Sequence, residues 1–250
     1  MTVDEVLRVR RLVKRYPGSA APAVNGLDFA VHPGECFGLL GPNGAGKTTA
    51  ISVICTLLRP TSGSVEVCGI DAQRDPVAVR RVIGLAPQDV ALYTSLTARE
   101  NLEYFGRLCG LSGRTLRSRI EECLALVGLE DTSEKRVSAF SGGMRRRANL
   151  AAAILHAPRV LLLDEPTVGI DAQSRNLILD NLRALRAAGM TLVYTTHYME
   201  EAAQLCDRIA IIDQGSLVAS GDPRALVGRV DGCANLEDLF LRLTGTRLRD

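Results

Sequence analysis

The sequence predicts an α/β fold with a helical insert, and three observations support this prediction. Short apolar runs typical of buried strands recur along the chain, and helical patterns separate several of them. One of these runs leads through a glycine-rich turn directly into a helical pattern. Between about residues 89 and 157 the strand-like runs disappear and helical signals replace them. We therefore expect an α/β core that a helical segment interrupts.

The composition is that of a soluble globular protein. At 250 residues the chain can bury a full core, and its 46% hydrophobic and 23% charged residues are ordinary values. A net charge of +2 gives no strong signal for binding nucleic acid or an anionic membrane. The dense basic cluster at residues 145–147 is either a solvated helix face or a nucleic-acid patch, and we favour the solvated face. We recognise no signal peptide, and no apolar run approaches the roughly 20 residues of a membrane span.

The seven cysteines predict a reducing environment. They form no Cys-x-x-Cys pair, and several of them lie inside apolar runs. We therefore interpret them as reduced core residues of a cytosolic protein, and not as a disulfide framework or a zinc site.

The N-terminal part predicts strands that lead to the glycine-rich turn. Residues 6–9 and 12–16 are strand-like, and residues 24–31 form a further strand after a Pro-Gly-Ser turn. Tyr16 ends a strand just before this turn. Its ring either packs in the core or at its rim, or stacks on the face of an adenine base.

The glycine-rich turn matches the phosphate-binding loop pattern of Gly, four residues, then Gly-Lys-Thr. A strand-like run at residues 36–40 precedes it and a helical pattern at residues 49–58 follows it. Backbone N–H groups of such a turn point at one anion, and the helix N-terminus adds a positive dipole. Lys47 can then reach the β- and γ-phosphates of a nucleoside triphosphate, and the Thr48 hydroxyl can ligate Mg²⁺. The predicted nucleotide-binding residues are Gly41, Pro42, Asn43, Gly44, Ala45, Gly46, Lys47, Thr48 and Thr49.

Gln88 comes after a predicted strand, a short helix and a second strand. Residues 64–68 alternate as a strand, residues 75–81 are a short helical stretch, and residues 82–86 are a strand of the buried type. A glutamine at the C-terminal end of such a strand lies at the edge where open α/β sheets bind ligands. Gln88 is therefore either a solvated surface residue or part of the site.

The insert contains three predicted helices. Thr97 and Glu100 form the capping box of a helix that continues to residue 108. Residues 114–127 repeat apolar side chains on one helical face, and residues 144–155 are strong helix formers.

A second anion site is predicted where the last insert helix begins. Ser141, Gly142 and Gly143 open this helix, so its free N–H groups and its dipole can hold a phosphate. A chain with one phosphate loop seldom needs another such site for the same phosphate. In a two-fold dimer, each phosphate loop could face the partner's helix, and two nucleotides would lie between the copies. We therefore expect this protein to dimerise.

The strand pattern resumes after the insert. Residues 160–163 are a buried strand that ends in Asp164 and Glu165, and residues 191–196 are a β-rich run that ends at His197. Helices are predicted at residues 173–187 and 199–205, strands at residues 208–212 and 216–220, and two short helical patterns in the tail, the clearer at residues 237–243.

The residues at these two strand ends predict hydrolytic chemistry. Asp164 and Glu165 lie at the sheet edge where the phosphate loop also lies. Asp164 can hold Mg²⁺, usually through water, and Glu165 can polarise an attacking water as a general base. Either acid alone could instead cap a helix. His197 could hydrogen-bond a γ-phosphate, although such a histidine alone would more often be a core or capping residue.

With these motifs in this order, the chain resembles the ATP-binding subunits of ABC transporters over essentially its whole length. The matching segments are the phosphate loop at residues 41–48, the glutamine loop at Gln88, the signature at residues 140–144, the acidic strand end at residues 161–166, the D-loop at residues 168–171 and the switch histidine His197. The resemblance implies a P-loop NTPase fold with a RecA-like core, an N-terminal antiparallel β segment and an α-helical subdomain of the ABC ATPase type.

The resemblance also implies roles, cofactors and partners. Tyr16 would stack on adenine, and Gln88 would contact the metal or the attacking water and relay movement to the insert. Because Glu165 and His197 are present, a site that hydrolyses ATP with Mg²⁺ is implied. The implied partners are a second ATPase subunit that forms a homodimer with this one and separate integral membrane permease subunits, without nucleic acid. The chain would then lie on the cytoplasmic face of the cell membrane, attached through the permease.

Departures from the family pattern are modest. Phe140 and Met144 replace the usual Leu and Gln of the signature, and Ile170 replaces Leu in the D-loop. Residues 196–210 and 235–245 are similar to the ABC-2 exporter branch, which includes drug-resistance, polysaccharide and natural-product exporters. We expect an ABC ATPase domain over residues 1–225, with its core at 1–88 and 158–225 and its insert at 89–157, and a C-terminal helical tail at 226–250.

Two alternative functions are weighed against the transporter. One is a non-transport ABC ATPase that acts on nucleic acid or ribosomes; such relatives typically carry two ATPase units or long coiled-coil inserts, and neither is seen. The other is a nucleotide-gated switch without turnover, and the intact Glu165 argues against it. The sequence does not name the cargo, because cargo would contact the membrane subunits.

Overall fold

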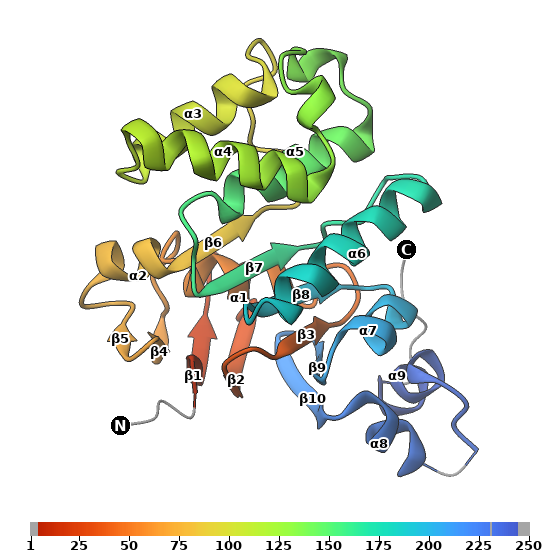
Figure 1. The fold of residues 1–250 in the computed structure, drawn as a ribbon. Helices are drawn as coiled ribbons and strands as arrows, with labels where there is room; N and C mark the ends of the chain where they lie inside the picture. The colour runs from red at the N-terminus through yellow and green to blue at the C-terminus, as the bar shows by residue number, and fades with distance from the viewer. Residues whose placement is uncertain (1–4, 231, 245–250) are drawn as a thin grey trace.

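The computed structural model describes residues 5–230 and 232–244, which form two sheets with helices around them (Figure 1). One sheet has four strands in the order β2-β1-β4-β5, and the other has six in the order β10-β9-β3-β8-β7-β6. In Figure 1, α3, α4 and α5 lie together beyond the β6 edge of the larger sheet, and α8 and α9 lie near β10. The predicted α/β fold with an N-terminal antiparallel segment and a helical insert is confirmed.

The four-stranded sheet is antiparallel and contains the N-terminal strands. β1 (Leu7–Lys14) pairs with both β2 (Val24–Val31) and β4 (Ser62–Val67), and β4 also pairs with β5 (Ile70–Asp71). The sequence predicted two strand segments where the structure has the single strand β1. The interruption is a register shift around Arg11, whose φ of 43° is left-handed. A β-bulge of this kind adds residues to one strand and breaks the alternation from which strands are predicted.

The six-stranded sheet forms the centre of the molecule. Four strands run parallel in adjacent positions, and β9 (Arg208–Asp213) is parallel to β3 on its other side. The four are β3 (Cys36–Leu40), β8 (Thr191–Thr196), β7 (Val160–Asp164) and β6 (Ile83–Ala86). Every residue of β3, β7 and β8 is buried, which explains why their sequences are mostly continuous apolar runs. Because parallel strands end at the same edge, the segments after β3, β6, β7 and β8 meet there.

Helices from both halves of the core cover this sheet. They are α1 (Lys47–Ile54), α2 (Pro76–Val82), α6 (Ala172–Ala187) and α7 (Met199–Leu205). α6 turns Ile178, Leu179, Leu182 and Leu185 into the core, and its exposed face carries the polar side chains. Their observed bounds lie within a few residues of the predicted ones.

The insert consists of three helices, α3 (Ala98–Leu108), α4 (Gly113–Val127) and α5 (Gly142–Ile154), and two short 3-10 turns, Glu130–Thr132 and Val137–Ala139, that the sequence did not predict. The capping box predicted for α3 is present. The Thr97 hydroxyl accepts from the Glu100 N–H at 3.0 Å, and the Glu100 carboxylate accepts from the Thr97 N–H at 2.8 Å. Two free N–H groups at the helix start are thereby satisfied.

The insert packs directly on the core. Buried side chains of α3, α4 and α5 form one cluster with those of α6 and β7. The two parts approach each other closely at Gly84 in β6, where a Cβ atom would lie 2.2 Å from the carbonyl oxygen of Ala153 in α5. The His156 ring bonds the Ile83 carbonyl oxygen at 2.8 Å at the same junction, and burial lowers the pKa of His156. The predicted insert therefore shares its hydrophobic packing with the core.

The C-terminal part adds an antiparallel edge strand and two helices. β10 (Ser216–Gly221) pairs with β9, and α8 (Pro223–Gly228) and α9 (Leu236–Thr244) follow. α9 buries Leu239 and Phe240, close to the predicted helical pattern at 237–243. The predicted tail also includes residues 231 and 245–250, which lie outside the described residues. Within the described ranges, no helix combines the length and the apolar character that crossing a membrane requires.

All seven cysteines are free thiols, which agrees with the absence of a disulfide framework. Four of them are buried, and Cys68 and Cys233 are partly exposed. Cys109 is exposed because it follows the last turn of α3, so its interpretation as a core residue is wrong.

Candidate functional site

The predicted site residues gather at one edge of the central sheet. The phosphate loop follows β3, Gln88 follows β6, Glu165 follows β7 and His197 follows β8. These strands are parallel, so the four segments leave the sheet at the same edge. The topology thus unites residues that are more than a hundred positions apart in sequence.

The phosphate loop has the backbone conformation that an anion-binding turn needs. Gly46 has a φ of 104°, and a Cβ atom there would lie 2.3 Å from the carbonyl oxygen of Ala23. Only glycine fits this position without displacing the backbone. α1 begins directly after Gly46 with no side-chain cap, which leaves the N–H groups of its first turn directed outward. This arrangement suits the oxygen atoms of a phosphate.

Lys47 places its charge inside the site. Its side chain is only 4% exposed, and its ammonium group donates to the carbonyl oxygens of Gly41 at 2.7 Å and Pro42 at 3.0 Å. It also lies 3.0 Å from a carboxylate oxygen of Glu165. The ammonium group is therefore held at the loop by three oxygen atoms, within reach of a phosphate bound there.

The Glu165 carboxylate is buried between the side chains of Lys47 and His197. One carboxylate oxygen contacts Lys47, and the other lies 3.2 Å from Nδ1 of His197. Its backbone is left-handed with a φ of 47°, which costs a residue other than glycine about 1–3 kcal/mol. The Glu165 N–H donates to the Thr195 hydroxyl at 3.0 Å, which helps to hold this conformation. The structure thus brings the predicted base and the predicted switch histidine into direct contact.

Asp164 and Thr48 suit a hard cation bound together with phosphate. Asp164 is buried, and one of its oxygens accepts from the Thr195 hydroxyl at 2.7 Å. Thr48 lies in the exposed first turn of α1. Among the described residues no group of three or more His, Cys, Asp or Glu side chains could hold a metal. One carboxylate and one hydroxyl are the protein ligands expected for Mg²⁺ that takes its other ligands from phosphate and water.

Tyr16 lies beside the phosphate-loop helix, as its predicted role requires. Its hydroxyl is 3.3 Å from the Thr49 hydroxyl, and the residue is 38% exposed. The Lys14 ammonium group lies 5.5 Å from the centre of its ring. An exposed aromatic ring at this distance from the loop is available to stack on a base.

The arginines of residues 145–147 include two contacts that the sequence did not predict. Arg146 donates to the backbone carbonyl oxygens of Gln88 and of Val168, the latter at 3.2 Å, and so joins the glutamine loop to the D-loop. Burial lowers the pKa of Arg146, while Asp89 and Glu165 oppose this effect. The prediction of a solvated helix face is therefore wrong for Arg146.

Arg147 makes the second unpredicted contact of this cluster. Its guanidinium donates to the carbonyl oxygens of Val127 and Gly128 at the end of α4, so it is not solvated either. No sequence pattern marks these two arginines, because their acceptors are backbone carbonyls of segments that are distant in the chain.

The predicted second anion site lies at the start of α5 and packs against α6. The Ser141 hydroxyl caps α5 by accepting from the Met144 N–H at 3.2 Å. A Cβ atom at Gly143 would lie 2.0 Å from Oγ of Ser174, so this glycine permits the two helix starts to touch. Within the described part of the chain, no hydrogen bond or ion pair links Ser141 to the phosphate loop. The two anion sites are therefore not joined within one copy.

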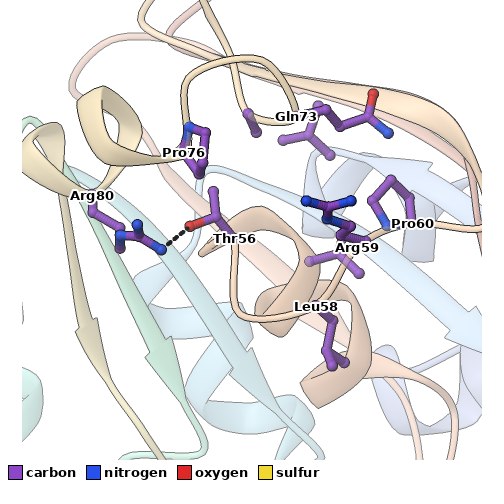
Figure 2. Close-up of a pocket in the computed structure, with 10 residues that line it drawn as sticks. Thr56, Leu58, Arg59, Pro60, Gln73, Pro76 and Arg80 are labelled. Carbon is purple, nitrogen blue, oxygen red and sulfur yellow. Dashed lines mark hydrogen bonds between the residues drawn. The ribbon is translucent and has the colours of Figure 1, made fainter.

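A separate cavity of about 370 Å³ lies past the opposite end of α1 (Figure 2). Arg80 donates to the Thr56 hydroxyl at 3.2 Å on one side of it, and Arg59 and Gln73 lie on the other. Its lining includes none of the predicted site residues. We therefore do not count it as part of the phosphate site.

The fold and the site together define a class of protein. A phosphate loop, an acidic strand end and a strand-end histidine at one sheet edge are the parts of a P-loop nucleoside triphosphatase. The helical insert, whose α5 offers a second anion site, adds the features of an ATP-binding cassette.

The chain belongs to the ABC transporter family, whose model matches residues 24–168. It is 47% identical over 239 residues to a linearmycin resistance ATP-binding protein of Bacillus subtilis (strain 168), covering 96% of this chain and 75% of the relative. It is 46% identical over 242 residues to a daunorubicin resistance ATP-binding protein of Streptomyces coeruleorubidus, covering 97% and 75%. A Nod factor export ATP-binding protein of Paraburkholderia xenovorans (strain LB400) is 45% identical over 214 residues, covering 86% and 70%.

Solved structures agree with this family. An ATP-binding subunit of an ABC transporter superposes with a TM-score of 0.85 at 29% identity, covering 96% of this chain and 99% of that one. A dimeric ATP-binding cassette in a post-hydrolysis state, bound to ADP and Pi, superposes with a TM-score of 0.79 at 28% identity, covering 86% and 98%. The predictions of an ABC transporter ATPase that uses ATP and Mg²⁺, dimerises and works with permease subunits are confirmed at the level of the family. The alternative of an ATPase that acts on nucleic acid or ribosomes is not favoured.

Proposed function

We propose that Glu165 is the catalytic base of this ATPase and that the site is complete only when a second copy closes on it. The observation that carries this proposal is the position of the Glu165 carboxylate, buried at the sheet edge between Lys47 and His197. A carboxylate held there, beside the residues that would bind the phosphates, can accept a proton from an attacking water.

The proposed roles in binding ATP and Mg²⁺ belong mainly to residues at the same edge of the central sheet. The backbone N–H groups of residues 41–49, apart from Pro42, would hold the phosphates, with Lys47 at the β- and γ-phosphates and Tyr16 against the adenine. Thr48, Asp164 and Gln88 hold Mg²⁺, which when bound supplies positive charge that offsets the charge of the phosphates. Gln88 is exposed just past β6, so its side chain is free to approach.

The ion pair between Lys47 and Glu165 has a direct consequence for hydrolysis. In the structure the Lys47 ammonium group is paired with the Glu165 carboxylate, which is the group that must accept a proton from water. When Lys47 turns to phosphate oxygens, Glu165 loses this partner and becomes free to contact water. Nδ1 of His197 lies 3.2 Å from the other carboxylate oxygen. A ring that carries a proton on each nitrogen can donate from Nδ1 to Glu165 and from Nε2 to a γ-phosphate oxygen.

The partner copy supplies the second half of each site. Ser141 is exposed at the start of α5, whereas Gly142 is half-buried and Gly143 is buried, and no hydrogen bond or ion pair in the described part of the chain links Ser141 to the phosphate loop of the same copy. In a two-fold dimer each of these helix starts faces the loop of the other copy. A solved relative is itself described as dimeric, which supports this arrangement.

Replacing Glu165 tests the catalytic assignment. Glu165→Gln keeps the shape of the side chain but cannot accept the proton, so we expect ATP binding and ATP-dependent dimerisation to remain while hydrolysis falls by roughly 10²-fold or more. Phosphate release measures hydrolysis, and light scattering with ATP and Mg²⁺ measures dimerisation. Hydrolysis at the wild-type rate would show that Glu165 is not the base.

We further propose that the chain lies on the cytoplasmic face of the cell membrane, held there by a permease that contacts the insert. Tyr93, Tyr104 and Phe105 form a group of aromatic rings with centroids 5.1–6.2 Å apart. Tyr93 and Tyr104 are 49% and 41% exposed, and the nearby Leu108 is 67% exposed. Such an exposed apolar patch is typical of an interaction surface.

We also propose a division of the chain into an ATPase core at residues 1–88 and 158–225, a helical insert at 89–157 and a C-terminal tail at 226–250.

The proposed direction of transport is export. Three relatives, each aligned with more than four fifths of this chain, are named for resistance to linearmycin, resistance to daunorubicin and Nod factor export. These names favour a drug, lipid, polysaccharide or natural product as the cargo.

Purification of the tagged chain from membranes in mild detergent tests the permease. A membrane-spanning protein that co-purifies, and is lost with Tyr93→Asp and Tyr104→Asp, is the expected result. Co-purification with ribosomes or nucleic acid instead would contradict the proposed function.

A further inference from the structure

One buried carboxylate has no role in the proposed reaction, although its contacts reach residues next to the proposed catalytic groups. Among the described residues, three acidic side chains are buried, namely Asp164, Glu165 and Glu201. The first two have proposed roles at the phosphates, but Glu201 lies in α7 and is 5% exposed. A buried charge is costly unless partners compensate for it, so the contacts of Glu201 indicate what it holds.

Glu201 collects hydroxyl groups on one oxygen and a positive charge on the other. Its Oε2 accepts from the Tyr194 hydroxyl at 2.6 Å, from the Thr167 hydroxyl at 2.8 Å and from the Thr196 hydroxyl at 3.4 Å. Its Oε1 lies 3.4 Å from Nε of Arg175, in ion-pair contact. Burial raises the pKa of Tyr194, and the charge of Glu201 raises it further, so this hydroxyl remains a donor.

These partners belong to the segments that carry the proposed catalytic groups. Thr167 is two residues after Glu165, and Thr196 is the residue before His197. The Thr196 hydroxyl also accepts from the Tyr198 N–H at 2.9 Å, so it fixes the backbone on both sides of the histidine. Arg175 lies in the first turn of α6, just after the D-loop. Glu201 therefore connects three segments that border the reacting phosphate.

The strained backbone of Glu165 explains why the turn after it has to be held by other residues. A left-handed residue other than glycine persists only when its surroundings hold it there. Thr195 holds Glu165 from the β8 side by accepting from its N–H. On the far side of the turn, the Thr167 hydroxyl is bound to Glu201. The turn that presents the carboxylate is thus held at both ends.

We propose that Glu201 is a positioning residue for ATP hydrolysis, which holds the turn after Glu165 and the segment around His197 in one arrangement. The inference rests on the proposed roles of Glu165 and His197. Displacing a catalytic group by about 1 Å can cost roughly 10²-fold in rate. The phosphate loop lies between β3 and α1, and the hydrogen bonds and the ion pair of Glu201 go to Thr167, Tyr194, Thr196 and Arg175, outside these two elements. We therefore expect the rate of hydrolysis to change more than the affinity for nucleotide.

The test is steady-state hydrolysis by the purified full chain, with kcat, KM for ATP and melting temperature measured for each variant. Glu201→Ala should lower kcat by about 10- to 100-fold while KM stays within about threefold. Thr167→Val, which removes only the hydroxyl contact, should also lower kcat. Because both changes break the same link, the double variant should be no slower than Glu201→Ala alone.

Two further variants separate positioning from folding. Glu201→Gln keeps an oxygen that can accept from Tyr194 and Thr167 and places an NH2 group where the other oxygen faces Arg175. It loses the Arg175 contact but keeps the hydroxyl contacts, so it should recover most of the lost kcat. Glu200→Ala removes the neighbouring exposed acid and should behave as wild type. If Glu201→Ala does not fold, Thr167→Val and Glu201→Gln still carry the test.

Three results would overturn the inference. They are an unchanged kcat in Thr167→Val, a loss in Glu201→Ala that appears equally in KM, and a double variant much slower than either single one. Failure of the proposed function looks different, because then Glu165→Gln would hydrolyse ATP at the wild-type rate whatever Glu201 does. An inactive Glu165→Gln beside wild-type kcat in the Glu201 and Thr167 variants would reject this inference alone.

Discussion

Lys47 illustrates how single side chains carry charge into this site. It is almost fully buried, yet three oxygen atoms surround its ammonium group, which offsets the cost of removing the charge from water. Two of these oxygens belong to the phosphate loop itself, so the lysine is held where a phosphate binds. The third belongs to Glu165, which links the binding residue to the proposed base.

Removal of this charge should weaken nucleotide binding. Lys47→Ala deletes a charge-assisted contact to phosphate worth about 1.5–3 kcal/mol, so we expect the Kd for ATP to rise by about 10- to 100-fold and hydrolysis to be lost. A fluorescent ATP analogue measures the affinity. The matched control is Lys135→Ala, because Lys135 is exposed in the insert. Equal affinities of the two variants would contradict the assignment of Lys47.

The positions of single residues could be predicted where the residues belong to a local motif, while their roles stay predictions. Asp164 ends a recognisable strand, and the phosphate loop, Glu165 and His197 follow recognisable strands, so their meeting at one edge could be expected from parallel topology. Arg146, Thr195 and Glu201 were missed. Arg146 donates to a backbone carbonyl oxygen, Thr195 donates to a carboxylate, and Glu201 accepts from the Thr167 hydroxyl. These partners lie in distant segments, and nothing in the local sequence shows that the three residues are bonded to them.

At the scale of the elements, the end of α4 shows how one helix stabilises another. α4 ends at Gly128, which is left-handed with a φ of 62°, and its last carbonyl groups have no partners inside the helix. Arg147 of α5 donates to two of them, those of Val127 and Gly128. The two insert helices are therefore joined by a charged donor as well as by their apolar faces.

Loss of this contact should lower stability without affecting the site directly. We expect Arg147→Ala to cost about 1–2 kcal/mol, which lowers the melting temperature by about 2–8 °C in a protein of this size. Arg145→Ala is the matched control, because Arg145 follows the same helix start and has no recorded side-chain hydrogen bond or ion pair in the described structure. Calorimetry compares them, and equal melting temperatures would show that the helix-end contact contributes nothing.

Elements were predicted best where periodicity and end signals agree. The capping box at Thr97 predicted the start of α3, and Gly128 and Gly189 follow the ends of α4 and α6 as glycines at helix ends often do. The two-residue strand β5 and the 3-10 turns were missed because they are too short to show a period. The bulge in β1 was taken for a break between strands, since extra residues disturb the alternation.

At the scale of the whole molecule, each copy contains two predicted anion sites, and no hydrogen bond or ion pair joins Ser141 to the phosphate loop in the described part of the chain. The phosphate loop follows β3 in the core, and the start of α5 packs on α6 in the insert. The sequence predicted both sites, and the family is one whose ATP-binding domains pair. What sequence reasoning could not predict is how core and insert are joined, because that depends on side chains such as Arg146 and on close contacts such as that of Gly84.

A charge placed at the start of α5 should prevent two copies from closing. In Ser141→Arg the long side chain would project from the exposed Ser141 position into the proposed interface. The dimer expected for Glu165→Gln with ATP should therefore dissociate, with a Kd raised by more than about 100-fold, or roughly 3 kcal/mol. Ser141→Ala is the control for the lost helix cap, which costs about 1 kcal/mol of stability but adds no bulk. Both are made in the Glu165→Gln background and compared by light scattering with ATP and Mg²⁺. If Ser141→Arg dimerises as well as Ser141→Ala, the helix start does not face the partner, and the second anion site must serve another purpose.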